Sequence, residues 1–119
     1  MTTVLNTAEV ASTFQKRPCY RYIRKTDRLP LEIDWDSEPN DILLKVKLFN
    51  PTGIGTWWIA SYDPETKIAF GVAELFERES GDFDLEEIVE FRGVFGLPIE
   101  RDLSYRTPRS LAEVLNRTN

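Results

Sequence analysis

The sequence predicts an α+β domain, in which a small antiparallel sheet of about four strands carries short helices against one face. Two observations support this fold class. Between residues 42 and 76, apolar residues alternate along segments that turn sequences separate, which is typical of strands joined by hairpins. Farther along the chain, helix-capping sequences precede apolar residues at helical spacing.

Strands are predicted at residues 42–50, 56–62 and 67–76. The turn between the last two begins with Asp-Pro, the favoured start of a type I turn, so these strands should form an antiparallel hairpin. Gly71 interrupts the returning strand and indicates a bulge or a close aromatic neighbour.

Two helices are predicted from their capping residues. Asp84, followed three residues later by Glu87, begins the first, and Gly93 is expected to end it in a left-handed conformation. Ser110, followed by Glu113, begins the second. Both helices carry apolar residues on one face, which should pack on the sheet.

The two ends of the chain add shorter elements. A helix is expected to start at Asn6 or Thr7 and to stop before Pro18. Alternating residues predict an edge strand at residues 19–25 and a last strand at residues 102–106.

Size and composition indicate one domain. The chain has 119 residues, of which 41% are hydrophobic and 29% charged, as in an ordinary folded domain with one core. No apolar run is long enough to cross a bilayer, and the N-terminus lacks the layout of a secretory signal. We expect a cytoplasmic domain over residues 1–119, with residues 1–28 as a peripheral basic segment, and no membrane contact.

Scarce reactive residues restrict the chemistry. The chain has no histidine, and Cys19 is its single cysteine, which excludes Ser-His-Asp and Cys-His catalysis, a Cys/His zinc site and an intrachain disulfide. Cys19 is expected to be a small buried hydrophobe. We expect no cofactor and no metal ion, and we favour a protein that is not an enzyme, although carboxylate chemistry requires no histidine.

Charge is unevenly distributed along the chain. The net charge is −5, yet residues 16–28 carry six cations and one acid. Basic residues interleaved with Tyr20 and Tyr22 are suited to phosphates and bases, whereas a solvated edge strand that balances the acidic body explains the same pattern. The candidate contacts to nucleic acid are Lys16, Arg17, Arg21, Arg24, Lys25 and Arg28.

Carboxylates near the end of the chain form a candidate catalytic group. In a strand, Glu100 and Asp102 face one side and Arg101 the other, so the two acids, with Asp63 or Glu74, are candidates to bind a divalent cation. Such a cluster would support metal-dependent hydrolysis. The alternative is that Arg101 is a structural ion-pair centre with one acid as its partner.

Aromatic and acidic residues are candidates to bind a protein. Trp57 and Trp58 are adjacent in a strand and therefore point to opposite faces, with Tyr62 expected on the face of Trp58. At least one tryptophan should be in the core, and the other is a candidate for an exposed binding surface. The acidic face of the first predicted helix comprises Glu86, Glu87 and Glu90, together with the preceding Glu79 and Asp82.

Four separated segments, KLFNP, TWWIASYDPETKIAFG, GDFDLEEI and GLPIERDLSYR, occur in this order. In this respect the chain resembles the bacterial domain-of-unknown-function 2958 family over residues 29–115. The resemblance implies a small bacterial protein of a kind found on plasmids and mobile elements, without an assigned activity. Two features depart from the family pattern: Ser61 stands where members often have an acid, and the basic segment 16–28 is not part of it.

Three functions are compatible with the sequence. We favour a non-catalytic interaction or accessory module that binds an unknown protein partner through an acidic or aromatic face, with a DNA-mimic inhibitor as its most specific form. The alternatives are a nucleic-acid-binding protein that uses the basic segment and a metal-dependent hydrolase that uses the carboxylates.

Overall fold

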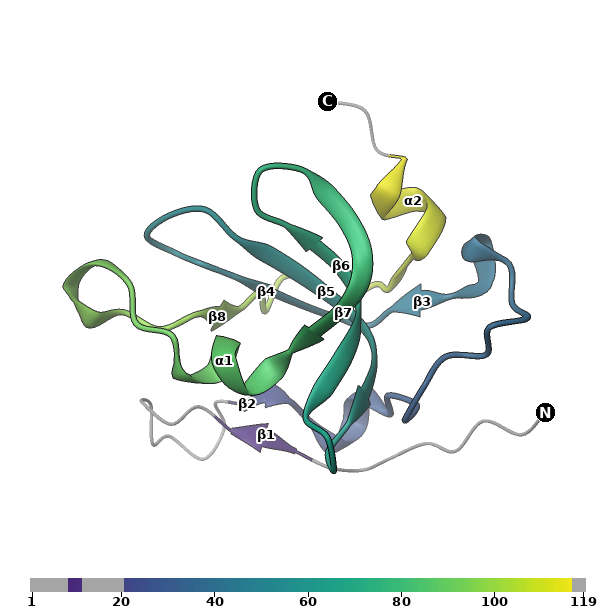
Figure 1. The fold of residues 1–119 in the computed structure, drawn as a ribbon, viewed down its shortest axis with the longest axis horizontal. Coiled ribbons are helices and arrows are strands. Elements are labelled where there is room, and N and C mark those ends of the chain that lie inside the picture. The colour runs from purple at the N-terminus through teal and green to yellow at the C-terminus, as the bar shows by residue number, and fades with distance from the viewer. Residues whose placement is uncertain (1–8, 12–20, 117–119) are drawn as a thin grey trace.

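The computed structural model describes residues 9–11 and 21–116. Its centre is a five-stranded antiparallel sheet with the strand order β7-β6-β5-β4-β8 (Figure 1). The α+β fold class is confirmed, and the sheet is larger than the predicted four strands. Its strands are β4 (Val46–Phe49), β5 (Thr56–Asp63), β6 (Ile68–Glu74), β7 (Arg78–Asp84) and β8 (Glu100–Arg101).

Smaller elements surround this sheet. Two pairs of short antiparallel strands accompany α1 (Leu85–Glu90), α2 (Leu111–Leu115) and three 3₁₀ turns (Lys25–Asp27, Pro39–Asp41 and Val94–Gly96). The first pair is β1 (Val10–Ala11) with β2 (Arg21–Ile23), and the second is β3 (Leu43–Leu44) with β9 (Arg109–Ser110). Among the described residues, no helix is long and apolar enough to span a membrane.

The predicted N-terminal helix is wrong at Val10 and Ala11. These residues form a strand because they pair with β2, whose Tyr22 and Ile23 are fully buried in the core. The starting positions proposed for that helix, Asn6 and Thr7, lie outside the described residues. The same holds for Lys16, Arg17, Pro18, Cys19 and Tyr20.

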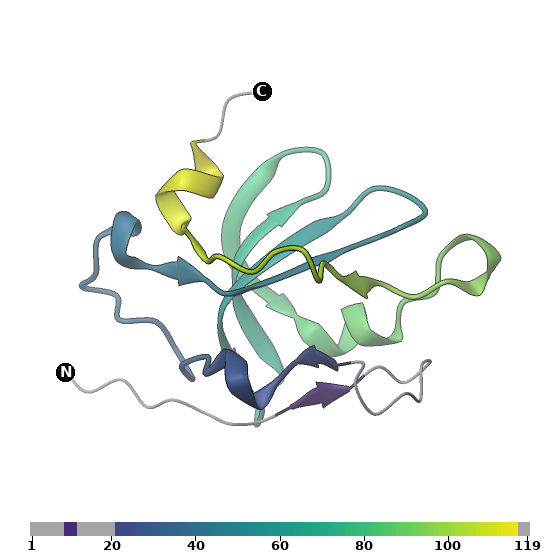
Figure 2. The same cartoon turned by 180° about the vertical axis from the view of Figure 1, so that it is seen from behind.

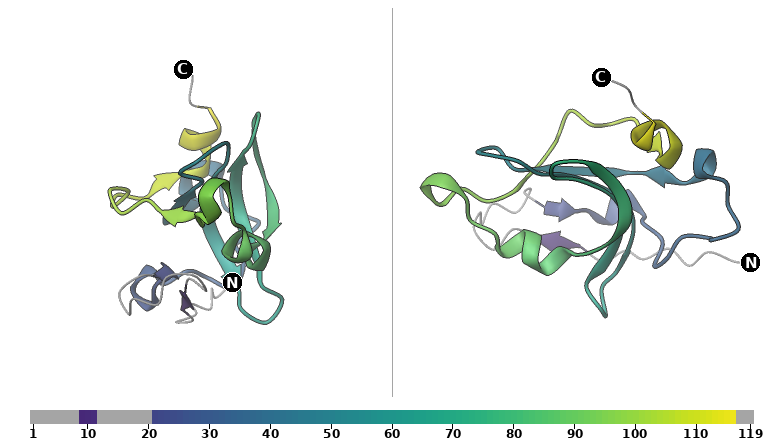
Figure 3. Two further views of the ribbon diagram at one scale, coloured as in Figure 1. Left: turned by 90° about the vertical axis from the view of Figure 1, so that its left-hand side faces the viewer. Right: turned by 45° about the horizontal axis from the view of Figure 1, so that its top comes forward.

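The two helices cover opposite faces of the sheet, not one face as predicted. Leu85, Ile88 and Val89 of α1 pack with Ile59 in one apolar cluster. Leu111 and Val114 of α2 pack with Trp58 and Val72 in a second cluster. Figure 2 shows the sheet from behind, and Figure 3 shows α1 and α2 on its two sides. Because the central strands are apolar on both faces, each face requires its own cover.

A β-bulge in β5 decides which residues face which cluster. Ile59 pairs with Gly71 and Ser61 pairs with Phe70, so Ala60 is an extra residue in β5. Beyond the bulge the alternation is reversed, and Tyr62 joins the cluster of Ile59. The prediction that Tyr62 shares a face with Trp58 is therefore wrong.

The backbone of β6 lies exceptionally close to β5 at Gly71. A Cβ atom on Gly71 would be 1.8 Å from the carbonyl oxygen of Trp58. The predicted bulge is present, although its extra residue belongs to the neighbouring strand β5, and the close neighbour of Gly71 is the backbone of Trp58 and not an aromatic ring. Only glycine fits at this position.

The local predictions from turns and caps are largely confirmed. The hairpin joins Asp63 to Ile68, and both Asp84 and Ser110 are N-caps that accept a backbone N–H. Gly93 differs from its prediction: its φ is −96°, and the chain leaves α1 in an extended conformation.

The strand predicted at residues 42–50 is broken at Lys45 into β3 and β4. The strand predicted at residues 102–106 is also wrong, because Asp102 ends the pairing with β4. Its carboxylate accepts hydrogen bonds from the N–H and the hydroxyl of Ser104 at 3.0 and 2.6 Å, which turns the chain away from the sheet.

Candidate functional site

An apolar groove of about 290 Å³ lies where the β4–β5 hairpin, the edge of β7 and α1 meet. Its walls combine buried residues with residues that are open to solvent, which gives the groove an apolar floor and an accessible mouth. The lining residues are Asn50, Ile54, Trp57, Leu75, Phe83, Asp84, Glu87, Ile88, Phe91 and Ile99.

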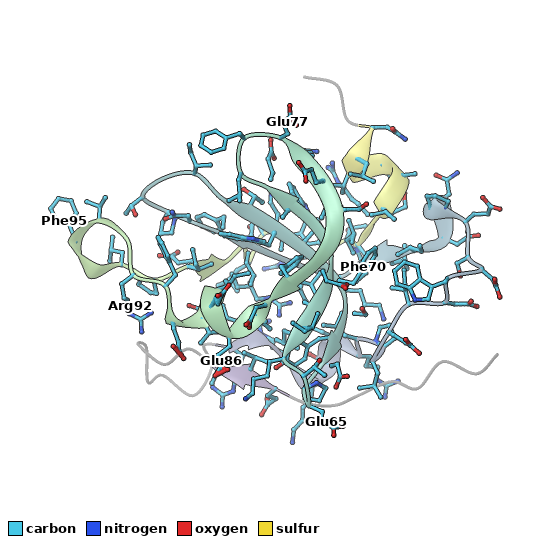
Figure 4. All side chains as sticks on the ribbon, in the orientation of Figure 1. Glu65, Phe70, Glu77, Glu86, Arg92 and Phe95 are labelled. Carbon is cyan, nitrogen blue, oxygen red and sulfur yellow. The ribbon has the colours of Figure 1, made fainter. Side chains whose placement is uncertain are left out.

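Large apolar side chains are exposed around this groove. Ile54 and Leu75 are 56% and 52% exposed in the hairpin loops, and Phe91 is 41% exposed after α1. The adjoining segments present Phe76 and Phe95, which are still more exposed. Figure 4 shows Phe95 at the tip of its loop, pointing away from the body of the protein. Exposed apolar groups gathered beside a groove are typical of an interaction site.

The loops that carry these side chains are packed against each other. The N–H of Gly93 donates to the carbonyl of Leu97 at 2.7 Å, which closes the loop after α1. A Cβ atom on Gly93 would lie 2.7 Å from the hydroxyl of Thr52, so this loop is in close contact with the β4–β5 hairpin. Phe95 within the loop has a φ of 60°, a strained value for a residue other than glycine.

Acidic residues border the groove on the side of α1. Asp84 and Glu87 line it, whereas Glu86 and Glu90 line a separate cavity with Tyr62 on the other side of the helix. Burial, followed by the charge of Glu86, raises the pKa of Tyr62 above its ordinary value of 10.0. The structure thus divides the predicted acidic face between two surfaces and places one member, Glu87, beside exposed apolar groups.

The two tryptophans have different environments. Trp58 is 4% exposed, and the cations of Lys47 and Arg78 lie 5.5 and 4.8 Å from the centre of its ring. Arg78 also donates to the carbonyl of Val114 at 2.7 Å and so connects α2 to the sheet. Trp58 is therefore a core residue, and Trp57 is the tryptophan that lines the groove.

Asp63 does not join the other carboxylates proposed for catalysis. Glu100 pairs with Phe49, which lies opposite Thr56 at the start of β5, whereas Asp63 ends the same strand. Asp63 instead accepts the N–H of Glu65 at 2.9 Å in the hairpin turn. No group of three acidic, cysteine or histidine side chains suited to a metal ion occurs in residues 9–11 and 21–116.

Asp102 stabilises the turn after β8, and its pKa provides a test. The hydrogen bond from the Ser104 hydroxyl, aided by Lys47 at 3.4 Å, lowers the pKa of Asp102 below its ordinary 3.8. This stabilisation is complete above the ordinary pKa and is lost as the pH falls through the lowered value.

Asp102→Asn should therefore reduce the free energy of unfolding by about 1 kcal/mol at neutral pH. Urea denaturation at several pH values measures the difference, which should shrink below the ordinary pKa of 3.8. Asp36→Asn, an exposed site, is the control and should leave stability unchanged. A difference for Asp102→Asn that persists undiminished in acid would contradict this role.

The basic segment is distributed over several environments. Arg24 and Arg28 line a second cavity, which shares no lining residue with the groove. Arg21 pairs with Glu9 at 3.7 Å, and Lys25 is exposed. The described part of this segment is therefore the short strand β2 followed by a turn at the rim of a cavity, and not one uniform basic strand over residues 19–25.

Arg101 is a structural ion-pair centre. Its guanidinium donates to both carboxylate oxygens of Asp27, at 2.6 and 2.8 Å, and to the carbonyl of Tyr22 at 3.1 Å. The side chains of Arg101 and Asp27 are 8% and 10% exposed. Arg101 thus forms a structural ion pair, but its partner is Asp27 of the basic segment, and the pair joins the turn at Lys25–Asp27 to β8.

The family model described as "Protein of unknown function (DUF2958)" matches residues 23–119. The chain belongs to the DUF2958 family. No curated protein and no solved structure matches this chain. The part of the DUF2958 match that the structure describes begins at the buried Ile23 and includes every residue of the apolar groove.

Sequence reasoning found some groove residues of this DUF2958 protein and missed others. It proposed Trp57 and Glu87 but not Ile54, Leu75 or Phe91. A signal was present, because apolar residues occupy the loops between strands and after α1, where polar residues are usual. Exposed apolar residues in loops indicate a binding surface.

Proposed function

We propose that this DUF2958 protein is a non-catalytic interaction module whose apolar groove binds a short segment of a protein partner. The observation that carries the proposal is the groove itself, in which exposed Ile54, Leu75 and Phe91 surround half-buried Trp57. Burial of such side chains by a partner would be favourable, and aromatic anchors contribute strongly to protein interfaces.

The charges at the groove indicate the chemistry of the partner segment. Asp84 and Glu87 line one side, and the chain as a whole carries a net charge of −5. A complementary segment would place apolar side chains in the groove and a lysine or arginine beside α1. An acidic segment would be repelled at the same position.

A selection from a displayed library of random short peptides tests this proposal. We expect the enriched peptides to combine apolar residues with flanking lysine or arginine. Leu75→Ser and Phe91→Ser should each weaken a selected peptide by about tenfold, because each removes an exposed apolar contact. Glu87→Lys should weaken the binding of basic peptides, and added salt should weaken that binding in the wild-type protein more than in this variant.

Matched controls separate the groove from the general surface. Leu43→Ser removes an apolar side chain that is 46% exposed in β3, and Glu65→Lys reverses an acid in the β5–β6 turn, away from the groove (Figure 4). Neither should change the affinity. Failure to enrich any peptide, or equal loss in groove and control variants, would overturn the proposal.

A further inference from the structure

A second cavity, of about 620 Å³, is lined by eleven residues, of which five are cations and two are acids. It lies between the 3₁₀ turn at Lys25–Asp27, the break between β3 and β4, and the segment after β8. It shares no residue with the apolar groove. The lining residues are Arg24, Thr26, Asp27, Arg28, Lys45, Arg101, Asp102, Leu103, Tyr105, Arg106 and Pro108.

The acids of this cavity are already engaged. Asp27 accepts both hydrogen bonds from Arg101, and Asp102 is bound by Ser104 and by Lys47. The remaining charge at the cavity is positive. In the part of the chain that the structure describes, four of its cations form no ion pair with a carboxylate: Arg24, Arg28, Lys45 and Arg106.

The positions of these cations are set by the surrounding backbone. Lys45 donates to the carbonyl of Arg28 at 3.1 Å, which holds its ammonium at the cavity. Arg28 itself has a φ of 51° at the end of the 3₁₀ turn. Arg101, through Asp27, joins this turn to β8, so both walls of the cavity are fixed before any ligand arrives.

One wall is suited to an organic group. Tyr105 lines the cavity together with Leu103 and Pro108. The hydroxyl of Tyr105 donates to the carbonyl of Leu44 at 2.6 Å and accepts the N–H of Arg109 at 3.0 Å, which fixes the ring. Burial raises the pKa of Tyr105, so this hydroxyl remains a donor at neutral pH.

We propose that this cavity binds a phosphate-bearing ligand of nucleotide size. Guanidinium groups match the geometry of phosphate oxygens, and several unpaired cations around one cavity favour a multiply charged anion. Arg28, Arg106 and Lys45 would contact the phosphate, and the ring of Tyr105 would contact the base or another planar group. The size of the cavity is in the range of small-molecule sites. Two sources share this chemistry: a free nucleotide and a nucleic-acid strand.

Calorimetry and fluorescence anisotropy test the proposal on the full chain. The probes are inorganic phosphate, a series of ribonucleotides (a mono-, a di- and a triphosphate, each tested separately), and a short labelled single-stranded DNA. We expect affinity to rise with the number of phosphates and to fall with salt concentration. Binding of nucleotides that DNA does not displace would identify the free nucleotide as the source. DNA binding that nucleotides do not match would identify the nucleic acid.

Charge-removing variants locate the site. Arg28→Gln with Arg106→Gln should weaken the bound probe by about tenfold or more, since each loses a charge-assisted hydrogen bond. Lys25→Gln is the matched control, because Lys25 belongs to the same turn and is exposed but does not line the cavity. It should change the affinity less than twofold, which is a change in binding free energy of less than about 0.4 kcal/mol.

Both substituted arginines are exposed, so the variants should fold as the wild type does, which thermal unfolding verifies. Two results would overturn the proposal. One is the absence of binding for every probe at low salt. The other is an equal loss for Lys25→Gln, which would show that net charge and not the cavity attracts the anion. The groove variants Leu75→Ser and Phe91→Ser should bind the probes normally, so failure of one proposal leaves the other intact.

Discussion

Gly71→Ala is expected to lower the free energy of unfolding by about 3 kcal/mol or more, enough to unfold much of the protein. The added methyl group would lie 1.8 Å from the carbonyl oxygen of Trp58, at the centre of the sheet, which is far inside van der Waals contact. A flexible side chain could move aside, but this oxygen belongs to the backbone of β5. The strands must therefore separate, which breaks hydrogen bonds in the middle of β5 and β6.

Gly81→Ala is the matched control for this effect. Gly81 lies directly opposite Gly71 in the neighbouring strand β7, and a Cβ atom there would have no neighbour within 4 Å. Its free energy of unfolding should change by no more than about 0.5 kcal/mol. Urea denaturation of both variants measures the contrast. Similar stability of the two variants would contradict the close approach of β5 and β6.

Arg101→Ala is expected to cost about 3–5 kcal/mol, because it leaves the buried carboxylate of Asp27 without its partner. It also removes the hydrogen bond to the carbonyl of Tyr22, at the point where the N-terminal part of the chain enters the core. Denaturant unfolding should show a lower midpoint. The loss should exceed the cost expected for an exposed surface pair, because both side chains are largely buried.

Two comparisons make this expectation specific. Arg106→Ala removes an exposed arginine five residues along the chain and should cost no more than about 0.5 kcal/mol. Combining Asp27→Leu with Arg101→Met should be less harmful than Arg101→Ala alone, because no buried charge is left unpaired. Equal costs for Arg101→Ala and Arg106→Ala would exclude a structural role for the ion pair.

Features that depend on a few neighbouring residues could be predicted from the sequence. The β5–β6 hairpin follows from Asp-Pro in the turn, and the N-caps at Asp84 and Ser110 follow from side-chain oxygens that bond the next turn of backbone. The family could also be predicted, since several motifs in a fixed order are specific.

Features that depend on pairing between distant segments could not be predicted. The extra residue at Ala60 is visible only in the register of β5 against β6, and it moves Tyr62 to the opposite face from the one that simple alternation indicates. Arg101 has two nearby acids in the sequence, yet its partner is Asp27, 74 residues away. The sequence indicated only part of the groove for the same reason. The loops that carry Ile54, Leu75 and Phe91 are separated in the sequence, and only the fold brings them together.

The pairing of distant segments also imposes an order of events on folding. Tyr22 donates its buried hydroxyl to the carbonyl of Ile99 at 2.5 Å, across 77 residues of sequence, and Arg101 binds Asp27 across a similar distance. Contacts this remote in sequence form slowly, since a long loop must close first. During synthesis, residues 22–27 leave the ribosome early but must wait for residues 99–101 before they can reach their final positions. Residues 22–27, which are synthesised early, are therefore among the last to reach their final packed positions.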